Sequence, residues 1–515
     1  MSRSLLKSIS IVSIMTLLSR ILGFVRDMVF AHLFGASAQM GAFLVAFKIP
    51  NFMRRLFAEG AFSQAFVPIF SEYKEKQTVE EVRLFLSRVI GTLAVVLCAV
   101  TVFGMVAAKY WVMVFAPGFV QEGKGQLALA TDLLRLTFPY LLPISLTACL
   151  AGVLNSYHRF AIPAVTPVIL NIILIIAAFL GVYYSPDQGI YAVAWGVMAA
   201  GFVQLLFLVP SLKRQNMLVW PRWGWSSPGV QRVLKLMGPA IFGASVAQIS
   251  LLLDTVFASF LKTGSIAWLY YSDRLMQFPL GMLGVALGTV CLPHLSTYFS
   301  RGDEKNFAHV IDWSLRLVLL LAVPAAIGIA FVSGPLLATL FQYGAFGPQD
   351  VLQAQKSLIA FAIGLIAFIA IKVLVSAFYA RQNIKTPVRI AVWAMLLNLV
   401  LNAALFIPLA HAGLALATSL SAIFNMVFLY YCLVKHGIYR VSKLWWQVCW
   451  KVVIASSLIS LLCYFGVPDT AVWLKWHAGQ RLGGLILVIL GVAGLYFFRF
   501  VLLRGSQAAF SFLAK

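Results

Sequence analysis

Cationic side chains lie inside stretches of this chain that otherwise have the composition of membrane-spanning helix. The stretch KIPNFMRRLFAEGAFSQAF, residues 48–66, carries Lys48, Arg54, Arg55 and Glu59 between apolar flanks. An arginine that faces lipid at the middle of a bilayer costs about 2.5–3.5 kcal/mol. Its planar guanidinium group binds phosphate oxygens through two parallel hydrogen bonds. These residue types therefore predict a hydrated site for an anion, and phosphate matches it best.

Helical spacing places several of these charges on shared faces. Lys48 lies seven residues before Arg55 and eleven before Glu59. At about 100° per residue, the three side chains share one stripe of a helix. In the preceding apolar run, Arg20 and Asp27 share a stripe in the same way. Both runs are therefore predicted to have a polar face.

Further polar residues accompany this pattern in both halves of the chain. Ser19 and Arg26 form the stripe next to that of Arg20 and Asp27. In the second half, YYSDRLMQFP carries Asp273 and Arg274 at a comparable depth in an apolar run. Lys372 lies deep in IAIKVLVSAFYARQ, and we treat it as a candidate cavity charge of the second half.

The acids in these runs are too few to neutralise the bases. If they faced lipid, Arg20, Arg26, Arg54 and Arg274 together would cost about 10–14 kcal/mol. One interpretation is that these arginines form ion pairs with acids of neighbouring helices, or that their side chains extend to the membrane interface. We favour a net-positive, water-filled cavity between two lobes that receives an anion. The candidate substrate-binding residues are Ser19, Arg20, Arg26, Asp27, Lys48, Arg54, Arg55, Glu59, Asp273, Arg274 and Lys372.

Two prolines lie in the same charged runs, Pro50 in the first half and Pro279 in the second. Proline is tolerated in membrane helices for ordinary packing reasons. The functional interpretation is that Pro50 and Pro279 are hinges for motion of the lobes. Both interpretations remain open from the sequence.

The composition predicts an all-α polytopic membrane protein. Hydrophobic residues make up 62% of the 515 residues and charged residues 11%, and the mean hydropathy is +0.93. The apolar runs are long enough for helices to cross a bilayer core of about 30 Å. The net charge of +23 is spread over short loops, which argues against nucleic acid as a partner.

Turn and charge clusters separate about fourteen spans. We predict them at 8–33, 42–70, 85–108, 129–154, 162–184, 189–211, 238–261, 266–298, 308–332, 354–380, 387–408, 412–434, 446–466 and 482–503. Every second connection is rich in Lys and Arg. The intervening connections hold only Lys109, Lys124, Lys262, Lys475 and Arg481. The positive-inside rule therefore places both termini in the cytoplasm.

The chain repeats itself at a nearly constant offset. Pro68-x-x-Ser71-x-Tyr73 recurs as Pro293-x-x-Ser296-x-Tyr298, and further short matches follow in the same order. Such an offset predicts two pseudo-symmetric six-helix lobes with the same orientation in the membrane. We expect the lobes at 1–215 and 216–440, followed by two extra helices in 441–515.

Nothing in the sequence predicts catalysis or a metal site. The six cysteines lack CxxC spacing, and the seven histidines lie without ligand spacing. No large extramembrane segment could house an active site. We expect a transporter rather than an enzyme, with no catalytic residue, no metal and no cofactor.

Several of these stretches resemble one known family. SRILGFVRDMVFAHLFGA and AFLVAFKIPNFMRRLFAEGAFSQAFVPIF are similar to the N-terminal signature of the MurJ (MviN) family of lipid II flippases. YYSDRLMQFPLGMLGVALGT, FYARQNIKTPV and the two extra C-terminal helices continue the likeness over essentially the whole chain. The family belongs to the multidrug/oligosaccharidyl-lipid/polysaccharide exporter superfamily.

The resemblance implies transfer of lipid II, an undecaprenyl-pyrophosphate disaccharide-pentapeptide, from the cytoplasmic to the periplasmic leaflet for peptidoglycan synthesis. It implies a bacterial inner-membrane protein, with lipid II and membrane lipids as partners and other cell-wall synthesis proteins as candidates. The cavity arginines of the family correspond here to Arg20, Arg26, Arg54 and Arg274. A groove for the lipid tail corresponds to the last two helices. Coupling to the membrane potential or to a monovalent cation stays open.

Three positions depart from the family pattern. Gly41 and Gln277 stand where relatives typically carry acids, and Asp254 stands where an Asn is expected. Any gating or ion-coupling role of those acids is therefore in doubt here. Alternatives are an exporter of another lipid-linked oligosaccharide, a small-molecule antiporter of the same superfold, and a membrane-embedded glycosyltransferase or ligase. An antiporter should have an acidic or neutral cavity, and a transferase should carry a catalytic group on a large loop.

Overall fold

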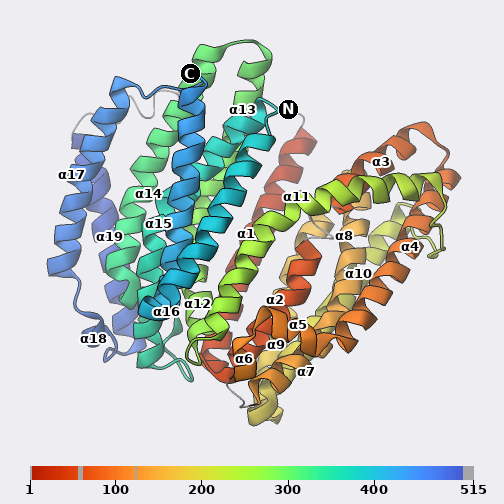
Figure 1. The fold of residues 1–515 in the computed structure, drawn as a ribbon, viewed down its shortest axis with the longest axis horizontal. Helices are drawn as coiled ribbons and strands as arrows, with labels where there is room; N and C mark the ends of the chain where they lie inside the picture. Colours follow the sequence, from red (N-terminus) through yellow and green to blue (C-terminus); the bar gives the residue numbers. More distant parts are fainter. Residues whose placement is uncertain (1–2, 56–61, 122–124, 503–515) are drawn as a thin grey trace. The chain divides into compact units, whose positions relative to one another are not determined.

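The protein is helical, as the sequence predicts (Figure 1). The computed structural model describes residues 3–55, 62–121 and 125–502, and it contains no β-strand among them. Ten helical segments in these ranges are long and apolar enough to cross a membrane. The predicted spans 387–408 and 412–434 are counted there as one helix, which kinks at Ala410 (φ 49°, ψ −135°). The predicted number of about fourteen is therefore not confirmed.

The chain forms two compact units, Met1–Gly264 and Ser265–Lys515. The first unit contains α1 (Arg3–Phe34), α2 (Ala38–Arg54), α3 (Ser63–Lys76), α4 (Val79–Val106), α5 (Ala108–Phe115), α6 (Gly118–Gln121), α7 (Gln126–Thr137), α8 (Leu141–Ser156), α9 (Ala161–Tyr184), α10 (Gly189–Arg214) and α11 (Pro228–Ser259). The second contains α12 (Ser265–Pro279), α13 (Val285–Ser300), α14 (Glu304–Phe341), α15 (Pro348–Ala380), α16 (Lys385–Lys435), α17 (Lys443–Gly466), α18 (Thr470–Trp473) and α19 (Ala478–Leu502). Short 3₁₀ turns lie at Phe138–Tyr140 and Pro186–Gln188, and a π-helical turn lies at Leu280–Gly284.

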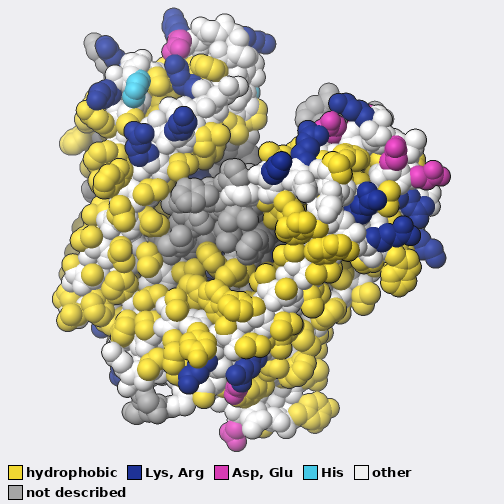
Figure 2. Space-filling view, turned by 45° about the vertical axis from the view of Figure 1, so that its right-hand side comes forward, with side chains coloured by type: hydrophobic (Ala, Val, Ile, Leu, Met, Phe, Trp, Pro, Cys, Tyr) yellow, Lys and Arg dark blue, Asp and Glu magenta, His cyan; other side chains and the backbone are white. Residues whose placement is uncertain are grey.

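Hydrophobic side chains cover much of the outer surface, as expected for helices that face lipid. On the face drawn in Figure 2 they form a broad area, and Lys and Arg lie mostly outside it. Leu206, Leu487 and Leu490 are among the most exposed, at 64, 73 and 65%. A water-soluble protein would hide such a surface in a core or an interface.

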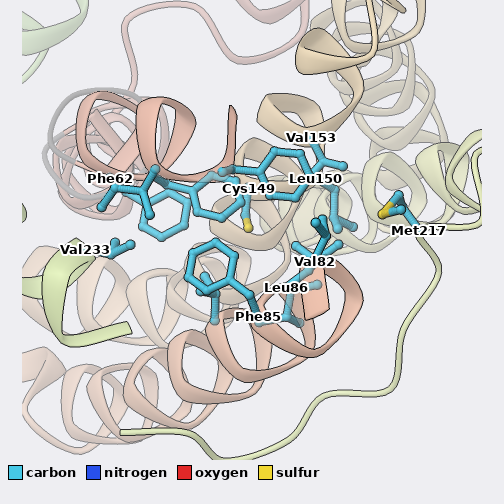
Figure 3. Close-up of a cluster of buried hydrophobic side chains, with 14 of the residues drawn as sticks. Phe62, Val82, Phe85, Leu86, Cys149, Leu150, Val153, Met217 and Val233 are labelled. Carbon is cyan, nitrogen blue, oxygen red and sulfur yellow. The ribbon is translucent and has the colours of Figure 1, made fainter. Parts of the chain in front are cut away.

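A core of aromatic side chains holds the first unit together (Figure 3). The rings of Phe66 and Phe85 stack with their centres 6.2 Å apart, and those of Tyr73 and Phe85 with theirs 4.2 Å apart. Cys149 and Val233 add packing from α8 and α11. Aromatic pairs of this kind contribute about 0.5–1.5 kcal/mol each beyond their burial. The core thus joins α3, α4, α8 and α11.

Helix α11 packs in the first unit, although the repeat predicts it as the opening helix of the second lobe. Near its start, Nη1 of Arg232 lies 2.8 Å from Oε2 of Glu72. The pKa of the Glu72 carboxyl lies below its ordinary value. The main cause is a hydrogen bond from Lys76, and the second is a hydrogen bond from Arg232. At its end, the Ser259 hydroxyl accepts a hydrogen bond of 3.0 Å from the main-chain N–H of Gly118. The predicted lobe boundaries at 215 and 440 follow the repeat and remain a prediction.

An extended segment between α10 and α11, residues 217–225, is held against α4 mainly by its backbone. The N–H of Arg222 donates to the Ser87 carbonyl at 3.0 Å, and the N–H of Gly224 donates to Thr92 Oγ1 at 3.2 Å. Met217, at the start of the segment, is buried in the aromatic core (Figure 3). Gly91 of α4 allows the approach, since a Cβ there would lie 2.2 Å from the carbonyl oxygen of Arg222.

Replacing Gly91 with alanine is expected to push this segment off α4. The atom that the new methyl group meets belongs to the backbone and cannot rotate away, so we expect a loss of about 1–3 kcal/mol in the free energy of unfolding. Denaturation of the purified protein in detergent measures this loss. Gly238→Ala is the control, because a Cβ on Gly238 meets nothing within 4 Å. Equal stability of the two variants would contradict the expectation.

Helix α14 is the element of the second unit against which the two C-terminal helices pack. Near its start, Asp312 is buried with Arg316, whose Nε lies 3.0 Å from Asp312 Oδ2. The hydroxyl groups of Tyr439 and Ser442 donate to the same carboxylate at 2.8 and 3.0 Å. Ser442 is also the N-cap of α17 and accepts from the Trp445 N–H. These contacts fix the start of α17 on α14.

Candidate substrate-binding site

Arg26 is buried in the first unit and bonds to two side chains. Its Nη2 and Nε atoms donate to Asp27 Oδ1 at 2.6 and 3.0 Å, and its Nη1 donates to Asn171 Oδ1 at 3.1 Å. The side chain of Arg26 is 5% exposed and that of Asp27 is fully buried. The Phe30 ring lies 5.7 Å from the guanidinium carbon. For Arg26, the structure thus supports the pairing interpretation, in which the residue joins α1 to α9.

The partner of Asp27 is Arg26 and not Arg20, although Arg20 shares the stripe of Asp27. Arg20 lies about two helical turns away, some 10 Å along the axis, and its side chain is exposed. Ser19 contributes its main-chain carbonyl, which accepts from Asn171 Nδ2 at 3.1 Å. Asn171 joins these contacts and was missed by the sequence analysis. Its signal was a single amide side chain inside the predicted apolar span 162–184.

The cations of α2 bond to neutral polar groups. Lys48 Nζ donates to the hydroxyl of Thr255 on α11. Arg54 donates from Nε and Nη2 to Asn51 Oδ1 at 3.0 and 2.9 Å. Both cations are half-buried, whereas Arg55 is exposed. These bonds help to orient Lys48 and Arg54. Glu59, the predicted acid of the same stripe, lies outside the described residues.

In the second unit, Asp273 and Arg274 each bond to a side chain of their own helix. Arg274 Nη2 donates to the Tyr270 hydroxyl at 3.1 Å, and the guanidinium carbon lies 5.1 Å from the centre of the same ring. The Asp273 carboxylate accepts a hydrogen bond from Gln277. Arg274 and Asp273 are partly exposed. Tyr270 was not predicted as a site residue, and it holds Arg274 from one turn earlier.

Lys372 is exposed on α15 and lies beside Gly284, the last residue of the π-helical turn, and Gly288 of α13. A Cβ on Gly284 would lie 3.6 Å from Lys372 Cγ, and one on Gly288 would lie 3.9 Å from its Cβ. Both distances are those of ordinary van der Waals contact. The cavity role of Lys372 remains a prediction.

Both predicted hinges lie close to irregular helix. Pro50 is buried inside α2, and α2 ends four residues later at Arg54. Pro279 ends α12 and is followed directly by the π-helical turn Leu280–Gly284. Arg55 also has π-helical conformation, and the repeat offset that relates Pro68 to Pro293 relates Arg55 to Leu280. π-Helical turns are frequent at functional sites, so the hinge role of both prolines stays a prediction with a structural basis.

An apolar hollow lies between the two C-terminal helices. Its volume is about 500 Å³, and it is lined by Ala455, Leu458, Ile459, Leu461, Leu462, Phe465 and Gly466 of α17 and by Leu495 of α19. Ala455 and Ile459 also pack against Leu320 of α14, so the hollow borders the core that α14 and α17 share. A hydrocarbon chain matches this lining chemically.

The described residues do not form a metal site. No group of three His, Cys, Asp or Glu side chains gathers within the described ranges. The six cysteines are free thiols. The chemistry that the predicted residues offer is therefore electrostatic binding by guanidinium and ammonium groups.

The helical fold, with its many long apolar helices, defines the class of a polytopic membrane protein. A solved inward-facing multidrug resistance MATE family transporter of the MOP superfamily shares the fold. Its TM-score is 0.64 at 12% sequence identity, and the match covers 82% of this chain and 94% of that one.

The relationship to one family of such proteins is much closer. The family described as "Lipid II flippase MurJ" matches residues 30–477. The "Probable lipid II flippase MurJ" of Vibrio cholerae is 44% identical over 503 residues, which cover 96% of this chain and 94% of the relative. The solved "Lipid II flippase MurJ, inward closed conformation" has a TM-score of 0.80 at 28% identity, covering 98% of this chain and 99% of that one. The chain belongs to the MurJ lipid II flippase family.

Proposed function

We propose that this protein moves lipid II from the cytoplasmic to the periplasmic leaflet of a bacterial inner membrane. The observation that carries the proposal is membership of the MurJ family, with relatives named lipid II flippases that match along nearly the whole chain. The many apolar helices suit a multi-pass membrane protein. Both termini are taken to be cytoplasmic, because the basic connections alternate along the chain.

The head group carries the chemistry that the predicted cations can bind. A pyrophosphate and the carboxylates of a peptide are anions, and guanidinium groups bind them through charge-assisted hydrogen bonds. Arg54 and Arg274 are partly exposed, and neutral side chains hold them in place. Arg20 is exposed on α1. Arg26 supports the site by holding Asp27 and α9, which is a role in positioning.

The prenyl tail is proposed to lie on the two C-terminal helices. The hollow between α17 and α19 is lined almost entirely by aliphatic side chains and one phenylalanine. Lipid tails are as apolar as these aliphatic side chains, so a prenyl chain can pass from the bilayer into the hollow without exposing apolar surface to water. The head group is then carried across by alternating access while the tail remains in lipid.

The membrane potential could supply the driving force for this cycle. An inside-negative potential drives an anion outward and returns the empty cationic site, by about 2.3 kcal/mol per charge fully moved for each 100 mV. Coupling to a monovalent cation is the second candidate. We propose neither a cofactor nor catalysis for this protein, and other cell-wall synthesis proteins remain candidate partners.

Depletion of the protein in growing cells tests the function. We expect lipid II to accumulate and to become inaccessible to a lipid II-specific probe added from outside, because its head group would stay on the cytoplasmic side. Restoring the wild-type chain should restore access. Unchanged access after complete depletion would contradict the proposal. A simultaneous loss of access to a different lipid-linked oligosaccharide would favour that alternative substrate.

A further inference from the structure

Arg481 lies at the start of α19, and its guanidinium group is almost fully buried. Its side chain is 6% exposed. Nε donates to the Trp473 carbonyl at 3.1 Å, and Nη2 donates to the Leu474 carbonyl at 3.0 Å. Nη1 donates to the carbonyls of Ala338 and Gln342 at 3.1 and 3.2 Å. All four acceptors belong to the main chain.

These acceptors come from the C-terminal ends of two other helices. Ala338 lies in the last turn of α14 and Gln342 is its C-cap, while Trp473 ends α18 and Leu474 is its C-cap. Carbonyls at a helix C-terminus lack partners within the helix, and the helix dipole favours a cation there. One planar fork therefore reaches the ends of both α14 and α18 from the first turn of α19. The Trp473 carbonyl also accepts from the Trp476 N–H, and the Leu474 carbonyl also accepts from the Gln342 amide. A lysine could not span this geometry, because its three donors radiate from one point.

Arg481 and its four carbonyl acceptors form what we call the clamp. Close packing around the clamp leaves the segment between α17 and α19 little room to move. Trp473 is fully buried against Leu485 and Val488 of α19. A Cβ on Gly484 would lie 2.9 Å from the Trp476 ring, and one on Gly334 would lie 2.1 Å from Thr470 Oγ1. The segment between α17 and α19 is thus fixed to the end of α14.

The rest of α19 packs through Leu485, Val488 and Val492 on apolar side chains of α14 and α17. Near the far end of the helix, the Tyr496 hydroxyl donates to the Leu320 carbonyl of α14 at 2.5 Å. The neighbouring Leu495 forms a wall of the hollow on α17. The width of the hollow therefore depends on this apolar packing and on the two polar ties to α14, at Arg481 and Tyr496.

The geometry points to Arg481 as a positioning residue for the lipid tail. It holds α19 at the spacing from α17 that accommodates a hydrocarbon chain. It does not contact the head group. This inference rests on the proposed function, because it needs a prenyl tail in the hollow between α17 and α19.

The test compares two ligands with the same pyrophosphoryl muropeptide head group and different tails, one undecaprenyl and one short and water-soluble. Wild-type protein in detergent should bind the long-tailed ligand more tightly. In Arg481→Gln, affinity for the long-tailed ligand should fall about tenfold, because a misplaced α19 no longer makes close packing contacts with the tail. Affinity for the short-tailed ligand should stay within about twofold. Arg481→Lys should fall between, because it keeps the charge but loses the fork.

Hydrogen exchange of the same samples without ligand measures how firmly the clamp holds the segment around Arg481. Amides in 470–485 should exchange faster in both Arg481 variants than in wild type. Lys475→Gln is the control: it removes one positive charge from an exposed position in the same segment and should change neither measurement.

The outcomes separate the clamp from the proposed function. An equal loss of affinity for both ligands would mean a general structural role and overturn the inference, as would unchanged exchange in both variants. If the wild-type protein binds both ligands equally well, the tail does not bind in the hollow, and the inference about Arg481 is wrong. Recognition of the head group would not be affected by this result. A wild type that binds neither ligand would overturn the proposed function itself.

Discussion

Alanine at position 274 is expected to reduce lipid II export roughly a hundredfold while the protein stays folded. Arg274 is partly exposed, and its hydrogen bond to Tyr270 lies within α12. Loss of a charged contact to phosphate costs about 3 kcal/mol, which corresponds to roughly a hundredfold in affinity. Export is measured as access of an external probe to lipid II in cells that depend on the variant.

A matched arginine serves as the control for this prediction. Arg135 pairs with Asp132 at 3.4 Å, and both side chains are 51% exposed. Exposed pairs of this kind contribute little to stability, so Arg135→Ala should export normally. The amount of folded protein in the membrane must be equal for the two variants. Full export by Arg274→Ala at equal abundance would remove Arg274 from substrate binding.

Arg26→Ala is expected to act differently, by destabilising the first unit. The substitution leaves the fully buried Asp27 without the guanidinium that bonds it and also removes the bond to Asn171. Breaking a buried ion pair by removing one partner costs about 3–5 kcal/mol. Denaturation of the purified protein in detergent should show a loss of this size in the free energy of unfolding, and the variant should be scarce in membranes.

The double variant Arg26→Met/Asp27→Leu separates stability from transport. Replacing both partners with apolar side chains removes the buried charge, so most of the lost stability should return. If Arg26 only supports the fold, export should return together with stability. A stable double variant without export would show that Arg26 contacts the substrate as well. Normal stability of Arg26→Ala would contradict the importance of the buried pair.

Much of the fold could be predicted because its signals are local. Apolar runs longer than a bilayer core, separated by basic turns, indicate membrane helices from composition alone. The break after Pro279 and the helical kink near Pro408 also lie at residues that restrict the backbone. The packing of α11 in the first unit was not predictable in this way. Its partners, such as Glu72 and Gly118, are far away in the sequence and have no periodic signature.

The contacts of the candidate site residues could not be predicted from the sequence. Helical spacing placed Asp27 on one stripe with Arg20, whereas in the structure Asp27 bonds to Arg26. A long side chain can reach its neighbour across the 100° between adjacent residues, so the stripe does not decide which partner is chosen. Asn171 completes the contact from 145 residues away. Such a partner is found only when α1 and α9 pack together.

By itself, the sequence determined that this protein is helical and spans a membrane, and that its membrane spans contain more basic than acidic residues. Hydropathy, helical period and charge are properties of short stretches, so they can be read without the fold. Only the tertiary structure decided which of those charges is neutralised and which stays accessible. Arg481 shows the reason most clearly. In the sequence it is one of a few charges in a weakly basic connection, and in the fold it is a buried clamp. Its acceptors are main-chain carbonyls, which every residue carries, and only packing brings the ends of α14 and α18 together around it.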